Sequence, residues 1–162
     1  MNYFEWFGIP VSPRVDMGQV TRKYMEMQRK FHPDYHADAS EEEQQEMLEK
    51  TSELNKAYAL FKDVDATIVY FLETVGLWKE GQKESLSPAF LMEMMELNES
   101  LDEGDDAVAK GEILSKIEAQ NRAIEPILLK NNAELSEKDT EQIILYLNQK
   151  KYLKRILERL SN

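Results

Sequence analysis

Apolar residues recur at intervals of three and four positions along much of this chain, and this spacing restricts its fold more than any other feature of the sequence. The clearest stripe consists of Met17, Val20, Tyr24, Met27 and Phe31. Side chains at this spacing share one face of an α-helix, so the stripe predicts an amphipathic helix with Asp16 as its N-cap. Only 6 Gly and 5 Pro occur among 162 residues, which favours long helices over turn-rich β structure. We therefore predict an all-α fold.

A second helix is predicted after Pro33, because proline disfavours helical geometry in the residue before it and so ends the first helix. Ser40 and Glu43 have the spacing of a capping box at a helix N-terminus. The apolar stripe that follows consists of Met47, Leu54, Tyr58 and Phe61. A short further helix is expected over residues 66–75. Residues 1–75 are therefore predicted to form one helical domain.

The remainder of the chain is predicted to form a second helical domain. Residues 76–86 are polar and contain two glycines, so we interpret them as a linker or elbow between the domains. Ser87 and Pro88 suit the N-cap and the first position of a helix. Ser136 suits the N-cap of the last helix. We expect residues 87–162 to fold as an antiparallel three-helix bundle.

The charge of the chain excludes several classes of partner. The 31 acidic residues outnumber the 20 basic ones, which gives a net charge of −11. Such a protein is repelled by the phosphates of nucleic acid and by anionic membrane surfaces, so we expect neither as a partner. The amino-terminal residues lack the basic region of a leader, and no apolar run of about 18 residues is present. We therefore expect a cytoplasmic, bacterial protein.

The residues that most often carry chemistry are scarce. The chain has no cysteine, which excludes thiolate nucleophiles and cysteine ligation of zinc or of an iron–sulfur cluster. Its only two histidines, His32 and His36, lie on either side of Pro33, which prevents the helix that would align both rings on one ion. We expect no metal site, no cofactor and no enzymatic activity of its own.

The tripeptide His32-Pro33-Asp34 is the most specific signal in the sequence. It directly follows a helix whose outer face is basic, interrupted only by Glu26; the basic residues are Arg22, Lys23, Arg29 and Lys30. Taken alone, the tripeptide is a helix stop followed by a turn. Together with the basic helix before it and Leu54-Asn55-Lys56-Ala57-Tyr58 after it, it resembles a J-domain, the helical hairpin that activates DnaK-type chaperones.

In J-domains, the His-Pro-Asp loop and the preceding basic helix dock on the chaperone's ATPase domain and linker and promote ATP hydrolysis. The resemblance implies that the chaperone contacts are His32, Pro33, Asp34, Arg22, Lys23, Arg29 and Lys30. The basic side chains would steer association with an acidic surface, so the encounter should weaken with salt. One departure is Tyr35, which stands where J-domains often have a basic residue.

The first helix of the second domain carries more apolar side chains than its core face needs. Its core stripe is Phe90, Met94, Leu97 and Leu101, which leaves Leu91, Met92 and Met95 outside the stripe. Between Glu84 and Ala109 there are eight acidic residues and no basic one. Apolar residues rimmed by acids are typical of a docking surface, and methionine adapts to a partner. A wide core stripe with solvated acids is the alternative.

This helix also carries a resemblance to a specific family. Ala89-Phe90-Leu91-Met92-Glu93 followed by Glu96-Leu97-Asn98-Glu99 is similar to the client-binding helix of the HscB (Jac-type) co-chaperones, and the likeness extends over nearly the whole chain. In that family the C-terminal domain binds the iron–sulfur scaffold protein IscU. The resemblance implies that the scaffold contacts are Leu91, Met92, Met95, Glu96, Glu99, Glu103 and Tyr152.

The function implied is that of a co-chaperone of iron–sulfur cluster biogenesis. It would bring an IscU-type scaffold to a DnaK-type, HscA-like chaperone and trigger ATP hydrolysis, which promotes cluster assembly and transfer. Two alternatives stay open. The chain could be a J-domain co-chaperone for a different or general unfolded client, or a plain helical interaction protein in which the tripeptide is incidental.

Overall fold

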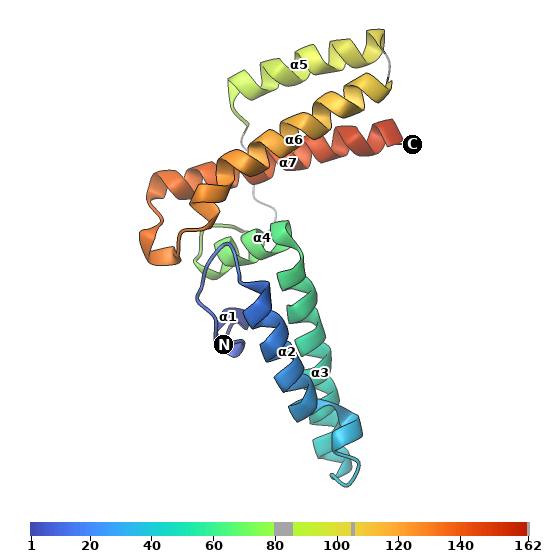
Figure 1. Cartoon of the computed structure of the whole chain (residues 1–162), viewed down its shortest axis with the longest axis vertical. Helices are drawn as coiled ribbons and strands as arrows, with labels where there is room; N and C mark the ends of the chain where they lie inside the picture. Colours follow the sequence, from blue (N-terminus) through green and yellow to red (C-terminus); the bar gives the residue numbers. More distant parts are fainter. Residues whose placement is uncertain (80–85, 105, 162) are drawn as a thin grey trace. The chain divides into compact units, whose positions relative to one another are not determined.

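The computed structural model describes residues 1–79, 86–104 and 106–161, and every regular element among them is helical (Figure 1). The predicted all-α class is confirmed. Contacts divide the chain into two compact units, Met1–Lys79 and Glu80–Asn162, which are described separately. Residues 80–85 of the predicted elbow lie outside the described residues, so the elbow at 76–86 stays a prediction.

The first unit consists of four α-helices and one 3-10 turn: α1 (Tyr3–Trp6), α2 (Met17–Phe31), η1 (Pro33–Tyr35), α3 (Glu41–Lys62) and α4 (Val64–Thr74). The predicted caps of α2 and α3 are confirmed, since Asp16 accepts from the N–H of Gly18 at 2.8 Å and Ser40 accepts from Glu43 at 3.2 Å. The prediction for α4 starts two residues late. Asp63 ends α3 and also caps α4 by accepting from the N–H of Ala66, so a single residue makes the break.

Helices α2 and α3 pack against each other along an aromatic and polar seam. The rings of Tyr24 and Tyr58 stack with their centroids 4.0 Å apart. Asn55 on α3 accepts hydrogen bonds from the hydroxyl of Tyr24 at 2.7 Å and from the amide of Gln28 at 2.9 Å. These contacts fix the rotation of α2 about its axis and so determine which of its side chains face solvent.

The amino-terminal residues, which have no helical periodicity, form α1 and close one end of this hairpin. Phe4 and Phe7 are buried against Phe61. The ring of Tyr3 stacks on Tyr70 and its hydroxyl donates to the carboxylate of Glu53. Burial, and then the hydrogen bond to Glu53, raise the pKa of Tyr3 to about 12. Helix α1 is therefore held by tertiary contacts rather than by its own length.

The second unit is the predicted three-helix bundle, which is confirmed. It consists of α5 (Pro88–Glu103), α6 (Asp106–Leu128), η2 (Asn132–Glu134) and α7 (Glu137–Ser161), and the three long helices lie side by side in Figure 1. Ser87 caps α5 by accepting from the N–H of Phe90, with Pro88 in the first turn as expected. Ser136 caps α7, because its hydroxyl accepts from the N–H of Asp139 while the Asp139 carboxylate accepts from the N–H of Ser136.

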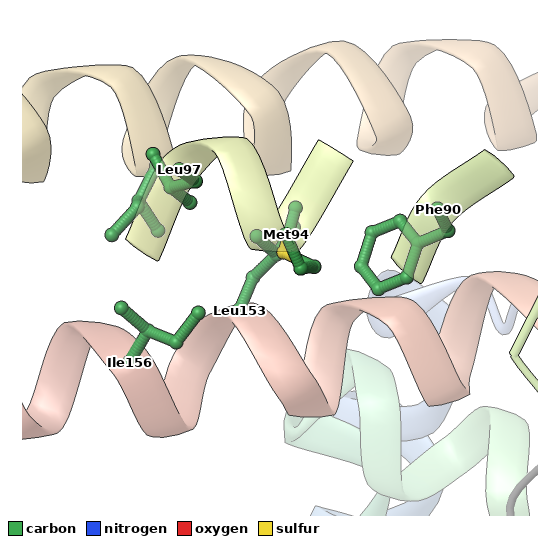
Figure 2. Close-up of a cluster of buried hydrophobic side chains, with 6 residues drawn as sticks. Phe90, Met94, Leu97, Leu153 and Ile156 are labelled. Carbon is green, nitrogen blue, oxygen red and sulfur yellow. The ribbon is translucent and has the colours of Figure 1, made fainter. Parts of the chain in front are cut away.

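The core between α5 and α7 is shown in Figure 2, where side chains from α5 point toward Leu153 and Ile156 on α7. The buried members of this cluster are Phe90, Met94, Leu97, Ile113, Leu153 and Ile156. The α5 members are the first three residues of the predicted core stripe. The side chain of Met94 is 1% exposed, whereas that of its sequence neighbour Met95 is 64% exposed.

Because Met94 is buried and Met95 is exposed, replacing each by alanine tests the packing of α5. Met94→Ala is expected to lower the free energy of unfolding of the second unit by about 2–5 kcal/mol, because it removes buried atoms and leaves a cavity. Met95→Ala should change it by less than about 0.5 kcal/mol. Urea unfolding followed by circular dichroism measures both. Equal losses for the two variants would contradict the burial of Met94 and the exposure of Met95.

The start of α7 contains a pH-sensitive contact. The ammonium of Lys130 lies 2.7 Å from the Asp139 carboxylate, and this hydrogen bond, with that from Ser136, lowers the pKa of Asp139 from its ordinary 3.8. A carboxyl whose pKa is lower in the folded protein stabilises the fold above its unfolded pKa. That stability is lost as the pH falls from about 4 through the folded pKa. Asp139→Asn should flatten this part of the acid-unfolding curve, which circular dichroism measures.

Candidate functional site

The tripeptide forms a tight loop at the end of α2, which we call the His-Pro-Asp loop (residues 32–36). His32 ends α2 with its N–H donating to the carbonyl of Gln28 at 2.9 Å, and Pro33 begins η1. The N–H of Asp34 donates to His32 Nδ1 at 3.2 Å. The Asp34 carboxylate lies 3.6 Å from the same nitrogen, yet its side chain is 86% exposed. It is therefore oriented from within the loop and open to a cation of a partner.

The predicted basic residues occupy the solvent side of α2. The stripe of Val20, Met27 and Phe31 is buried on the opposite side. At about 100° per residue, Arg22, Lys23, Arg29 and Lys30 share one face, which we call the basic face of α2. Arg22, Arg29 and Lys30 are exposed, and Lys23, which is less exposed, lies 3.8 Å from Glu26. The structure thus places a positive surface beside the His-Pro-Asp loop.

A surface hollow joins the loop to the helix. Its lining residues are Met25, Gln28, Arg29, His32, Asp34 and Tyr35. Three of the predicted chaperone contacts, Arg29, His32 and Asp34, therefore meet in one hollow. The other four, Arg22, Lys23, Lys30 and Pro33, do not line it. The residues that connect the loop to the basic face come from the last two turns of α2.

Sequence reasoning missed Met25 and Gln28 as members of this surface. A signal for Met25 was present, because Met25, Arg29 and His32 are spaced four and three residues apart and so share a helix face. Tyr35 is 68% exposed, and its ring meets that of His32 edge to face with centroids 6.3 Å apart. Where J-domains often have a cation, this chain presents an aromatic ring.

The second candidate surface lies on α5, on the side away from the bundle core. At about 100° per residue, Leu91, Met92, Met95, Glu96 and Glu99 cover one continuous face opposite Phe90, Met94 and Leu97. We call these five residues the outer face of α5. All five are exposed; Met92 is 65% exposed and Leu91 43% exposed. The structure therefore brings them together as a surface rather than as a wide core stripe.

The charges on α5 are placed against its own stability. A helix is favoured by acids near its N-terminus and by bases near its C-terminus. Helix α3 follows this rule with three glutamates in its first turn, but α5 has no acid in its first turn and no base in its last turn. One acid has an internal role, since Glu93 lies 3.4 Å from Lys116 on α6. Glu96 and Glu99 lie in neither the first nor the last turn of α5, and both are exposed on its outer face.

Two predicted scaffold contacts, Glu103 and Tyr152, are not part of the outer face of α5. Glu103 is the last residue of α5, and its side chain lies outside the described residues. Tyr152 on α7 is partly buried, and its ring meets that of Phe90 edge to face with centroids 6.0 Å apart. Phe90 belongs to the core side of α5, so Tyr152 lies at the edge of the core rather than on the outer face. Like the residues of the outer face, both stay predictions as scaffold contacts.

Two other kinds of site, a metal site and a membrane-spanning helix, are absent from the described ranges. No group of three or more histidine, aspartate or glutamate side chains there is arranged to hold a metal ion. None of the helices in this part of the chain has the length and apolar character needed to cross a membrane. The features with a recognisable chemistry are the His-Pro-Asp loop with the basic face of α2, and the outer face of α5.

Comparison with known proteins relates this chain to one family. Residues 86–161 match the family model described as the HSCB C-terminal oligomerisation domain. The co-chaperone protein HscB homologue of Vibrio vulnificus is 38% identical over 111 residues, covering 66% of this chain and 65% of that protein. The homologue of Photobacterium profundum is 34% identical over 125 residues, covering 76% of this chain and 73% of that protein.

A solved structure extends the likeness to both units. The crystal structure of the human co-chaperone protein HscB matches with a TM-score of 0.75 and 25% identity, covering 99% of this chain and 81% of that one. The sequence match therefore spans about two thirds of the Vibrio relative, while the structural match spans nearly all of this chain. The chain belongs to the HscB co-chaperone family.

Proposed function

We propose that this protein is a co-chaperone that couples an iron–sulfur scaffold to a chaperone ATPase. The outer face of α5 binds an IscU-type scaffold, and the His-Pro-Asp loop with the basic face of α2 stimulates ATP hydrolysis by a DnaK-type, HscA-like chaperone. The protein acts in the cytoplasm of a bacterium and catalyses no reaction of its own. The observation that carries this proposal is that one chain of the HscB family presents both surfaces, each exposed.

The action on the chaperone is electrostatic and conformational. The exposed cations of α2 attract an acidic surface and raise the association rate. The Asp34 carboxylate then accepts a charge-assisted hydrogen bond from a cationic side chain of the chaperone. The contact stimulates hydrolysis only by binding the hydrolysis-competent conformation more tightly than the alternative. The loop is suited to this because its own hydrogen bonds orient Asp34 before the partner arrives.

The action on the scaffold is the burial of an apolar patch with an acidic rim. Met92 and Met95 provide adaptable apolar area at the centre of the outer face, while Glu96 and Glu99 select a partner with basic residues around an apolar patch. Glu103 and Tyr152 would extend the same contact at its edges. Because both surfaces belong to one chain, binding the scaffold also raises its effective concentration at the chaperone.

A second function is favoured by one observation. Methionine side chains on an exposed helix face also suit the loose recognition of unfolded chains. The protein would then deliver general unfolded clients. A binding comparison distinguishes the two functions. A scaffold-specific face should bind the folded scaffold much more tightly than it binds unfolded model peptides, when both are tested against the full chain.

The decisive experiment is a steady-state ATPase assay with the DnaK-type chaperone and the IscU-type scaffold of the same organism. We expect the full chain alone to stimulate hydrolysis, and chain and scaffold together to stimulate it more than the sum of their separate effects. Stimulation without scaffold synergy would favour the general-client function. No stimulation at any salt concentration would refute the co-chaperone proposal.

A further inference from the structure

The last backbone carbonyls of α2 lack their usual hydrogen-bond donors because of the turn that follows the helix. In a continuing helix, the carbonyls of Lys30 and Phe31 would accept from the N–H groups of Asp34 and Tyr35. Here the N–H of Asp34 donates to His32 Nδ1 at 3.2 Å, and the N–H of Tyr35 donates to the His32 carbonyl at 3.0 Å. The His-Pro-Asp turn therefore consumes the donors that the helix end needs.

Two side chains from outside α2 replace them. His36 donates from Nε2 to the carbonyl of Lys30. Thr51 on α3 donates from its hydroxyl to the carbonyl of Phe31 at 3.2 Å, in a buried position. The bond to the Phe31 carbonyl is buried, so leaving that carbonyl without a donor costs free energy. The bond to the Lys30 carbonyl is exposed, and it ties His36 of the turn to the end of α2.

His36 is itself held from two sides. Its N–H donates to the carbonyl of Pro33 at 3.0 Å, which closes the turn. Its carbonyl accepts from the side-chain amide of Gln44 on α3 at 3.4 Å, and the same amide reaches Ala37 at 3.1 Å. His36 thus connects the end of α2, the turn and the start of α3.

We propose that His36 and Thr51 are positioning residues of the chaperone-activating loop. By bonding two of the carbonyls that the turn deprives of donors, those of Lys30 and Phe31, they hold the Asp34 carboxylate at a constant place beside the basic face of α2. Neither side chain needs to touch the chaperone. This inference rests on the proposed stimulation of a chaperone ATPase, but the order of the loop can be measured without it.

A positioning role predicts a particular kinetic signature. The basic face drives the encounter and is unchanged in variants of His36 and Thr51, so the concentration that gives half-maximal stimulation should change by less than about twofold. The maximal stimulation should fall by roughly fivefold or more, because Asp34 is correctly placed for only part of the time. A purely structural defect that lowers the folded fraction would instead raise the half-maximal concentration and leave the maximum unchanged.

The test compares removing and rescuing variants in the full chain. His36→Phe keeps a ring but has no N–H to donate, whereas His36→Gln places an amide N–H at nearly the same distance. Thr51→Val keeps the shape of the side chain without its hydroxyl, and Thr51→Ser restores the hydroxyl. Thr74→Val is the matched control, because the Thr74 hydroxyl donates to a helix carbonyl, that of Tyr70 at 2.7 Å, in α4.

We expect the Phe and Val variants at positions 36 and 51 to lose maximal stimulation, the Gln and Ser variants to keep most of it, and Thr74→Val to match the original chain. Wild-type stimulation by His36→Phe, or an equal loss from Thr74→Val, would overturn the inference.

Backbone ¹⁵N relaxation of Asp34 in the isolated full chain provides an independent measurement. Its order parameter should fall from about 0.85 toward 0.6 or below in His36→Phe and recover in His36→Gln. If the unmodified chain fails to stimulate any chaperone, the proposed function fails, yet this measurement still decides whether His36 positions the loop. An unchanged order parameter in His36→Phe would refute the positioning role itself.

Discussion

Replacing Asp34 by asparagine is expected to reduce stimulation of the chaperone ATPase to near its basal rate. The substitution keeps the size of the side chain and the backbone N–H bonded to His32, and it removes only the charge that a cation of the chaperone would meet. Losing one member of a desolvated charge pair costs about 2 kcal/mol or more, which is roughly thirtyfold in the preference of the contact for the hydrolysis-competent conformation. A single-turnover ATPase assay over a range of co-chaperone concentrations measures the effect.

The matched control is Asp38→Asn, which removes an equal charge from an exposed residue in the loop just before α3. We expect it to retain nearly all of the stimulation, because surface charges away from a contact contribute little. Circular dichroism should show both variants equally helical. If Asp34→Asn stimulated as well as Asp38→Asn, the His-Pro-Asp loop would be excluded as the chaperone contact.

The second large effect is expected on the outer face of α5. The double variant Met92→Ala/Met95→Ala should weaken binding to the scaffold by about 2–4 kcal/mol, or roughly 30-fold to 1,000-fold, because it removes most of the apolar area at the centre of the face. Its free energy of unfolding should be nearly unchanged, since both side chains are exposed in the free protein. Isothermal titration calorimetry with the scaffold measures the binding.

Leu129→Ala is the control for this variant. Leu129 is also exposed, at 66%, but it follows the end of α6 and lies outside the outer face. We expect it to bind scaffold like the original chain. The double methionine variant should also still stimulate the chaperone in the absence of scaffold. Undiminished scaffold binding by that variant, or an equal loss from Leu129→Ala, would contradict the assignment of the outer face.

Much of the helical structure could be predicted from the sequence because its signals are local. The caps at Asp16, Ser40, Ser87 and Ser136 involve residues two or three positions apart, and all four form as predicted. The burial of Met94 and the exposure of Met92 and Met95 follow from the geometry of a single helix. The outer face of α5 and the basic face of α2 were therefore predictable once the helices were.

Other features could not be predicted because they depend on contacts between distant residues. Helix α1 is too short to have a periodicity, and its N-terminal end is held by Tyr3, whose N–H donates to the hydroxyl of Tyr70, 67 positions away. Tyr152 follows the pattern of its own helix, yet its contact with Phe90 depends on how α5 and α7 pack.

By itself, the sequence determined the class of the fold, the position of most helices and the two faces that carry the proposed function, because each depends on residues within about one helical turn. Only the tertiary structure decided how the His-Pro-Asp loop is held. The hydroxyl of Thr51 reaches the carbonyl of Phe31 across 20 residues, and Asn55 sets the rotation of α2 from the facing helix. No local pattern encodes such bonds, because they exist only when α2 and α3 pack in one register.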